Sequence, residues 1–285
     1  MFINDITDGI QSKCKIFADD TKLYNYASNH RTLQNDLHSI QQWSQKWDLH
    51  FNVSKCKTIH FGAQNPEHQY NLDPSSHVTI PTGSEEKDLG VIFDQTLNFD
   101  KHINEKVGKA NCVLSIIKRN FKNPDPNTFV KMYKTMVRPH VEYCNSVWSP
   151  LYKRQKLKIE RVQRRATKMI HKIKDLPYLE RLRYLRLPSL KYRRLRGDLI
   201  QCFKIVKGFD NIDIKSLIFK NRSNRGHPYT LTVLCRRSQL RSNVFSHRIV
   251  NAWNNLPSFI VMSNTVDQFK SLLDHELKDI IYDFD

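Results

Sequence analysis

Two adjacent carboxylates, Asp19 and Asp20, follow an apolar run that ends in Phe17 and Ala18, and a second strand-like segment begins directly after them. A tight turn at this point would present both side chains to solvent. Carboxylate oxygens are the ligands that Mg²⁺ prefers, and the bound ion keeps waters for substrate phosphates. Two such ions about 4 Å apart can assist in-line phosphoryl transfer, which normally needs a third carboxylate from a neighbouring strand. The alternative interpretation is that the two acids simply form an exposed turn.

The segments around the two acids predict a small α+β unit. Residues 13–26 read as two strands with the acids between them. A helix is expected over 30–47, because apolar residues from Leu33 to Trp47 recur at the spacing of one helical face. The other expected elements are strands over 49–53 and 58–61, a polar loop over 64–77, and a second hairpin around Pro81 and Gly83.

After Asp94 the apolar residues take on helical spacing. A stripe from Phe99 to Ile117 predicts one helix, and a second is expected to begin with Asp125 as N-cap and to end before Pro139. The remaining expected helices cover 156–173, a segment from Pro188 through Phe203, and 266–280, whereas the stretch from Arg222 to that last helix is expected to be loop-rich.

The positive charge is concentrated in one part of the chain. The net charge is +18, and residues 151–207 hold 19 Lys and Arg against 4 Asp and Glu. Such a block is typical of a protein that binds a polyanion, most often nucleic acid. The residues expected to contact the phosphate backbone lie on one helix: Arg161, Arg164, Arg165, Lys168 and Lys172. The alternative is that this is merely a solvated helix face.

The cysteines and the hydropathy exclude several classes. The six cysteines are isolated and no Cys/His cluster has zinc spacing, so no zinc site is expected. Their separation and the absence of a leader predict reduced thiols in an intracellular protein, in the nucleus or the cytoplasm and not secreted. No apolar run approaches the roughly 20 residues that span a bilayer, so no membrane partner is expected.

Several motifs, in order, resemble the reverse transcriptase of non-LTR (LINE-type) retrotransposons. They are "FADD", "LHFNVSKCKTIHFG", "KDLGVIFDQTLNFDKHI", "YKTMVRPHVEYCNSVWSPLYK" with "IERVQRRATKMI", and "YLERLRYLRLPSLKYRRLRGDLIQCFKI", with "SHRIVNAWNNLP" near the end. The resemblance covers nearly the whole chain. It implies a partial palm over 1–95, a helical thumb over 96–175 and a C-terminal basic, helical region over 176–285.

The resemblance also implies roles for individual residues. Asp19 looks like the main metal ligand and Asp20 like its neighbour, with Mg²⁺ as the ion and Mn²⁺ as an alternative. Phe17 and Ala18 match positions that shape the floor beside the primer end, and Gly90 fits a primer grip. Lys55 resembles a lysine proposed to donate a proton to departing pyrophosphate, although Lys57 and a plain surface lysine fit equally well.

Two hypotheses follow, because the strand with the third catalytic Asp and the fingers have no counterpart in this sequence. The first is that the chain is the C-terminal part of an RNA-directed DNA polymerase, inactive alone and dependent on a chain that supplies the missing palm and fingers. The second is a non-catalytic module that holds template and primer through its basic region. Both predict an RNA template and a DNA primer as partners, and weak Mg²⁺ binding.

Overall fold

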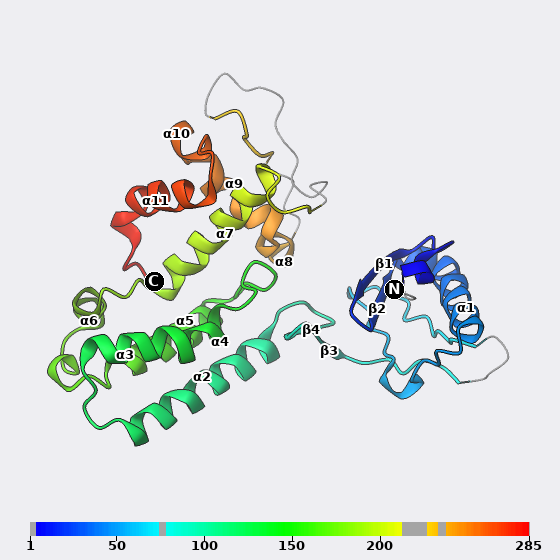
Figure 1. Ribbon diagram of the computed structural model, residues 1–285, viewed down its shortest axis with the longest axis horizontal. Helices are drawn as coiled ribbons and strands as arrows, with labels where there is room; N and C mark the ends of the chain where they lie inside the picture. The colour runs from blue at the N-terminus through cyan, green and yellow to red at the C-terminus, as the bar shows by residue number, and fades with distance from the viewer. Residues whose placement is uncertain (1–3, 74–77, 213–226, 233–237, 285) are drawn as a thin grey trace. The chain divides into compact units, whose positions relative to one another are not determined.

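The computed structural model describes residues 4–73, 78–212, 227–232 and 238–284. It divides into two compact units, Met1–Leu97 and Asn98–Asp285 (Figure 1). The first unit combines two small antiparallel sheets with one long helix, and the described part of the second is helical. The chain therefore has an α+β composition, as the sequence predicts. No helix in the described residues is long and apolar enough to cross a membrane.

The first unit is built from two hairpins and a helix. Strands β1 (Lys13–Phe17) and β2 (Asp20–Tyr24) pair antiparallel, and so do β3 (Glu85–Asp88) and β4 (Val91–Asp94). Between them lies α1 (His30–Lys46), with single 3-10 turns at Asn4–Thr7, Ala27–Asn29 and Val53–Lys55. The two strands around the acids and the helix that follows are thus as predicted.

The second hairpin lies later than the sequence indicated. Instead of flanking Pro81 and Gly83, its strands flank Leu89 and Gly90. Pro81 has no N–H to donate, and its carbonyl accepts the N–H of Thr58 at 2.9 Å in an isolated contact. Leu89 and Gly90 both have positive φ, at 43° and 86°, which is the geometry that closes a two-residue hairpin.

The strands expected over 49–53 and 58–61 are also wrong. The first segment runs into the 3-10 turn at Val53–Lys55, and the second contributes one isolated bridge, between Thr58 and Thr82. A small core forms nevertheless, because Tyr70, Leu72 and Ile80 are buried with the apolar face of α1 packed against them. Of the loop predicted over 64–77, residues 74–77 lie outside the described residues.

The second unit contains ten helices among its described residues. They are α2 (Asp100–Asn120), α3 (Pro126–Met132), α4 (Arg138–Glu142), α5 (Lys153–Thr167), α6 (Tyr178–Leu185), α7 (Leu190–Val206), α8 (Gln239–Asn243), α9 (Phe245–Asn254), α10 (Ser258–Val261) and α11 (Val266–Glu276). Single 3-10 turns follow at His171–Ile173 and Lys278–Ile280. The cap predicted at Asp125 is present, because its side chain accepts the N–H groups of Asn127 and Thr128. Ser189 also caps a helix, accepting the N–H of Tyr192.

The helix that begins at Pro126 does not end before Pro139. A π-helical turn, Tyr133–Val137, joins α3 to α4, and the N–H of Arg138 donates to the carbonyl of Tyr133. Proline has no N–H for the ordinary bond to the fourth preceding carbonyl. The wider turn allows the chain to pass this point without breaking, and the expectation of a stop is corrected.

Other helix boundaries differ as well. α5 starts three residues earlier than expected and stops at Thr167, with a separate 3-10 turn after it. The segment expected to be loop-rich contains the three short helices α8, α9 and α10, whose apolar stripes are brief; residues 222–226 and 233–237 lie outside the described part. The boundary placed at residue 175 stays a prediction, and across it the Tyr178 hydroxyl donates to Glu160 at 2.6 Å.

The core of the second unit has two centres. Helices α7, α9, α10 and α11 bury a cluster in which the rings of Phe203 and Phe269 stack at 4.1 Å beside Trp253. Helices α2, α4 and α5 lie side by side (Figure 1), with Ile103, Leu114 and Val162 among their buried residues. This second bundle fixes the orientation of the basic helix.

Candidate functional site

The β1–β2 hairpin places the two adjacent acids at its tip. Phe17 pairs with Asp20 across the strands, so that Ala18 and Asp19 form a two-residue turn. Ala18 adopts a φ of 53°, in the left-handed region that tight hairpin turns require. Asp19 therefore lies in the turn and Asp20 at the first position of β2, and both side chains are exposed.

Phe17 and Ala18 lie beside the acids, as the sequence analysis expected. Phe17 is 59% exposed although it is a large aromatic residue on a strand. Its neighbours two and four residues back on the same strand, Lys15 and Lys13, are exposed too. The face of the hairpin that carries Phe17 thus also carries Lys13, Lys15 and, opposite Phe17, Asp20, while Lys22 on the same face pairs with Asp88 of the second hairpin.

A buried carboxylate that sequence reasoning missed holds the hairpin in place. Asp36 on α1 is 3% exposed, and its two oxygens accept the backbone N–H groups of Gln11 at 3.1 Å and Ser12 at 2.7 Å. These two residues immediately precede β1. One signal was available, because Asp36 falls between Leu33 and Ile40 on the apolar face of its helix.

Two other acids close in sequence to the hairpin do not complete a metal site. Asp5 accepts the indole N–H of Trp43 at 2.8 Å, which ties it to α1, and Asp8 is exposed. Across the described residues, no group of three or more His, Cys, Asp or Glu side chains is placed to hold a metal ion. Asp19 and Asp20 offer hard oxygen donors that fit Mg²⁺ in kind, but two carboxylates are fewer than a two-ion site uses.

The two candidate lysines have different surroundings. Lys57 lies 2.6 Å from Glu86 on β3, and the Lys57 ammonium lowers the pKa of that carboxyl group. Lys55 ends the 3-10 turn and is exposed. No hydrogen bond or ion pair within the described residues joins Lys55 to Asp19 or Asp20, so its catalytic role stays a prediction.

Gly90 lies in the β3–β4 turn. Its φ of 86° is strained for any residue with a Cβ atom, so the turn alone accounts for a glycine at this position. An ion pair between Lys22 and Asp88 links this hairpin to β2. The assignment of Gly90 to a primer grip stays a prediction.

The basic residues of the second unit lie on and around α5. Arg161, Arg165 and Lys168 are exposed, as is Lys172 in the following 3-10 turn. Arg164 differs from them. It is half-buried, with its guanidinium carbon 4.8 Å from the centre of the Tyr178 ring.

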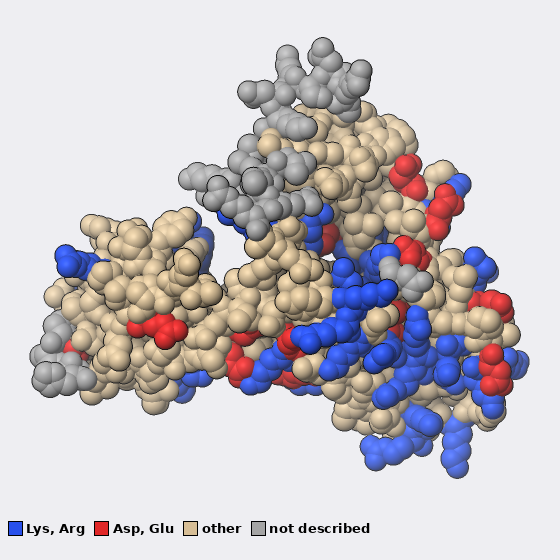
Figure 2. All heavy atoms as spheres, turned by 180° about the vertical axis from the view of Figure 1, so that it is seen from behind, with Lys and Arg blue, Asp and Glu red and all other residues tan. Residues whose placement is uncertain are grey.

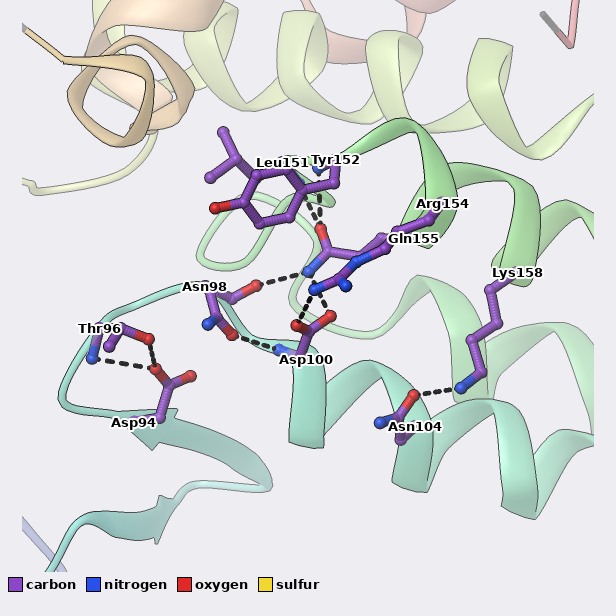
Figure 3. Close-up of polar contacts among 10 residues, drawn as sticks. All are labelled: Asp94, Thr96, Asn98, Asp100, Asn104, Leu151, Tyr152, Arg154, Gln155 and Lys158. Atoms are coloured by element: carbon purple, nitrogen blue, oxygen red, sulfur yellow. Dashed lines mark hydrogen bonds and ion pairs between the residues drawn. The ribbon is translucent and has the colours of Figure 1, made fainter.

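Helix α5 is fixed against α2 in a parallel arrangement (Figure 3). Arg154 contacts Asp100 at 2.6 Å, Lys158 contacts Asn104, and Arg165 contacts Asn111 at 3.2 Å. Each pair is separated by 54 residues, so the two helices run in the same direction in register. Apart from Asp100, the partners on α2 are neutral amides, which orient the cations of α5 without neutralising them.

The start of this arrangement is held by a buried glutamine. Gln155 is 2% exposed; its amide group donates to the carbonyl of Asn98 at 2.9 Å and to Asp100 at 2.7 Å. Its oxygen accepts the backbone N–H groups of Leu151 and Tyr152 (Figure 3). The N-terminus of α5 is therefore locked to that of α2.

On the second unit, Lys and Arg side chains gather into a broad basic face (Figure 2). Exposed cations of α2, α5, α6 and the segments between them include Lys101, Lys109, Lys118, Arg119, Lys122, Lys153, Arg154, Lys156, Lys158, Arg161, Arg165, Lys168, Lys172, Lys174 and Arg183. A density of this kind attracts a polyanion and makes its binding dependent on salt.

Comparison with known proteins gives two relatives. An RNA-directed DNA polymerase from the mobile element jockey of Drosophila funebris is 29% identical over 192 residues, which is 64% of this chain and 18% of the relative. A probable RNA-directed DNA polymerase from the transposon X-element of Drosophila melanogaster is 24% identical over 179 residues, 59% of this chain and 18% of the relative.

The chain is similar to mobile-element RNA-directed DNA polymerases. This confirms the resemblance to non-LTR reverse transcriptases inferred from the ordered motifs. The match spans less than a fifth of the length of either curated polymerase. No protein-family model matches the chain, and no solved structure matches it.

Proposed function

We propose that this polymerase-like chain is part of a non-LTR retrotransposon reverse transcriptase, contributing half of the palm (1–95), the thumb (96–175) and a C-terminal basic region (176–285). The observation that supports this most directly is the pair of exposed carboxylates at the tip of a two-residue hairpin turn, in a chain similar to RNA-directed DNA polymerases. The substrates proposed are an RNA template and a DNA primer.

In this proposal Asp19 and Asp20 hold Mg²⁺ or Mn²⁺, together with a carboxylate that the described residues do not supply. The ions, when bound, activate a 3′-hydroxyl and stabilise the leaving pyrophosphate. Phe17 supports the primer end beside the acids, and the buried Asp36 holds the start of β1, so that the turn keeps its position when charge accumulates there.

The second unit supplies positioning. Exposed cations on α5 contact phosphates of a template–primer duplex, and the register between α2 and α5 fixes their spacing. Because such contacts fall on the backbone, they place the duplex without reading its sequence.

The test measures metal binding and polymerisation separately. Titration of the full chain with Mn²⁺, followed by the electron paramagnetic resonance signal of the free ion, should show weak binding that the double variant Asp19→Asn/Asp20→Asn abolishes. Asp8→Asn, a change at another exposed acid of the same unit, should leave it intact. Equal Mn²⁺ binding by the wild type and the double variant would contradict the metal assignment.

Primer extension on a homopolymer RNA template tests the catalytic part. Without a third carboxylate, the chain alone should extend the primer no more than the double variant does. Extension above that level would show that the chain carries a complete polymerase site, and the proposed dependence on a further chain would be wrong.

A further inference from the structure

Two arginines meet at the junction of α5 and α6 without an acidic partner. Arg181 is 3% exposed, and its guanidinium carbon lies 5.4 Å from the centre of the Tyr178 ring; Arg164 lies 4.8 Å from the same ring. One nitrogen of Arg181 donates to the backbone carbonyl of Arg164 at 3.2 Å. The Nε atoms of both arginines are buried and have no hydrogen-bond partner, and neither arginine forms an ion pair within the described residues.

No carboxylate forms an ion pair with either arginine among the described residues, although the buried Glu160 interacts electrostatically with Arg164. Burial lowers the pKa of Arg181, the nearby charge of Arg164 adds to that effect, and Tyr178 opposes it. Burial also holds the pKa of Tyr178 far above its usual range, so the ring stays neutral at physiological pH. Arg248, a largely covered arginine elsewhere in the unit, contacts Asp198 at 2.8 Å, whereas the buried Arg194 also has an Nη1 atom without a hydrogen-bond partner and feels the charges of Glu160 and Asp198.

The buried carboxylate of Glu160 is already engaged by other groups. It accepts the Tyr178 hydroxyl at 2.6 Å and the backbone N–H of Leu190 at 3.1 Å, and it feels the charge of Arg194 as well as that of Arg164. Buried charges in proteins are normally paired, because an isolated one loses its hydration without compensation. The two arginines therefore present unused donors that suit an anion from outside the chain.

One residue of the C-terminal segment, Phe284, packs against Arg164 and Tyr178. The Phe284 ring lies 4.7 Å from the guanidinium carbon of Arg164 and meets the Tyr178 ring edge-on at 5.0 Å. The segment is held by Ser189, whose N–H donates to the carbonyl of Ile281 at 2.9 Å, and by Lys191, which contacts Asp283 at 2.7 Å.

We propose that Arg164 and Arg181 form a recessed site for a phosphate group, with Tyr178 as its floor and Phe284 as its cover on the Arg164 side. The planar, forked guanidinium matches a phosphate oxyanion, and two of them give directional recognition that surface lysines do not. Phosphate is favoured because Arg161, Arg165 and Lys168, on the turns of α5 that flank Arg164, are exposed and attract a polyphosphate chain. Where the phosphate belongs to a nucleic acid, the site rests on the proposed function.

Inorganic phosphate is the first probe. The full chain is unfolded by heat in phosphate or in chloride at equal ionic strength. Phosphate at about ten times its dissociation constant should raise the melting temperature by about 3 °C over chloride. The variant Arg181→Met should lose this shift, and without phosphate it should melt no lower than the wild type, because an unpaired buried charge has been removed.

Three further variants keep the test decisive. Arg183→Met, at an exposed position of the same helix, should retain the full phosphate shift. Arg181→Lys keeps the positive charge but loses the forked guanidinium, and it should retain less than half of the phosphate-induced rise in melting temperature. This variant takes the place of Arg181→Met if Arg181→Met does not fold. Phe284→Ala should increase the affinity for phosphate. An equal phosphate shift in the wild type and in the Arg181 variants would overturn the proposal.

Oligonucleotides separate the possible sources of the phosphate. A single-stranded DNA 12-mer with a 5′-phosphate is compared with the same strand ending in a 5′-hydroxyl, both competing with inorganic phosphate. If only the phosphorylated strand competes, the group bound at the site is a terminal phosphate. If both strands compete, it is a backbone phosphodiester. If the chain shows the phosphate shift but does not bind duplex, the phosphate site stands and the proposed function is refuted. If the chain binds duplex equally with and without Arg181→Lys and shows no phosphate shift, the phosphate site is refuted and the proposed function stands.

Discussion

In the β1–β2 hairpin the charged side chains of interest, Asp19 and Asp20, are exposed at a turn, and a single buried carboxylate on α1 holds the preceding residues. In the second unit the exposed cations of α5 stand on a helix that is locked to α2 by a buried glutamine and pairs in constant register. Because the hairpin acids are exposed, we expect that they can be changed with little effect on the fold. The basic helix, in contrast, depends on buried polar groups for its orientation, so changes at those groups should be far more costly.

The largest expected loss of stability is in the second unit. Burial raises the pKa of Asp198, and the hydrogen-bonded, charged Arg248 opposes that rise. Arg248 also donates to the carbonyls of Asn145 and Ser146. The substitution Asp198→Ala leaves Arg248 buried without its partner and should cost about 3–5 kcal/mol in urea unfolding. Asp267→Ala breaks a pair in which Asp267 is 92% exposed, and should cost less than about 0.5 kcal/mol. Similar losses for both would remove the contrast between buried and exposed pairs.

Nucleic-acid binding should respond strongly to the exposed cations. Replacing four exposed cations together by Gln (Arg161, Arg165, Lys168 and Lys172) should flatten the slope of log affinity against log salt by about 3. At 0.1 M salt this corresponds to an affinity about a thousandfold lower than that of the wild type, if the two affinities are equal at 1 M salt. Arg164 is left out because it packs between two rings. Fluorescence anisotropy with RNA–DNA hybrids of different sequence should show a uniform loss, while Asp19→Ala leaves the slope almost unchanged. An unaltered slope in the fourfold variant would show that the exposed cations of α5 form a solvated helix face that does not contact phosphates.

Acid should destabilise the second unit through His102. This side chain is 1% exposed, its ring lies 4.8 Å from that of Trp148, and burial lowers its pKa from 6.5 to about 4. Below pH 6.5 the unfolded chain therefore binds a proton at His102 that the folded chain does not bind until about pH 4. The free energy of unfolding consequently decreases as the pH is lowered through this range. The loss approaches about 3 kcal/mol near pH 4. His102→Gln should reduce that pH dependence, and His171→Gln, at an exposed site, should preserve it.

Asp36→Ala should produce a smaller and more local effect. It removes two carboxylate acceptors from the N–H groups of Gln11 and Ser12 and should cost about 2 kcal/mol. Hydrogen exchange of amides in β1 and β2 should accelerate, with little change in α5. Asp8→Ala is the control in the same unit. Uniform acceleration across both units would mean that the hairpin does not depend on this anchor.

The smallest effect is expected at the hairpin tip. The double variant Asp19→Asn/Asp20→Asn removes two exposed, adjacent like charges and should change stability by no more than about 0.5 kcal/mol in either direction. Thermal unfolding without divalent ions measures this. A loss above about 2 kcal/mol would show that the acids have a structural role.

Features that repeat or have strong local chemistry were predictable from sequence. The two strands around Asp19 and Asp20, the helix over 30–47 and the cap at Asp125 were all expected from alternation, helical spacing and capping rules. The exposure of Arg161 and Lys168 followed from the same periodicity. These signals are local, so a single segment of sequence carries them.

The features that were missed depend on distant parts of the chain. Asp36 is recognisable as an anchor only once the residues before β1 lie against its helix, and Arg164 differs from Arg165 because Tyr178 and Phe284 fold over it. The second hairpin was misplaced because Gly83 looked like a turn residue while Leu89, an unusual residue at positive φ, was not expected to form one.

The π-helical turn between α3 and α4 explains an arithmetic regularity in the sequence. Phe129, Tyr133, Val137 and Val141 are all buried and recur every four residues. In an ordinary helix of 3.6 residues per turn, each step of four would rotate the side chain by about 40° beyond a full turn, and three steps would carry it about 120° away from the core. A wider turn absorbs part of that rotation, so a strict four-residue apolar repeat leading into a proline marks the place where a helix widens to keep one face inward.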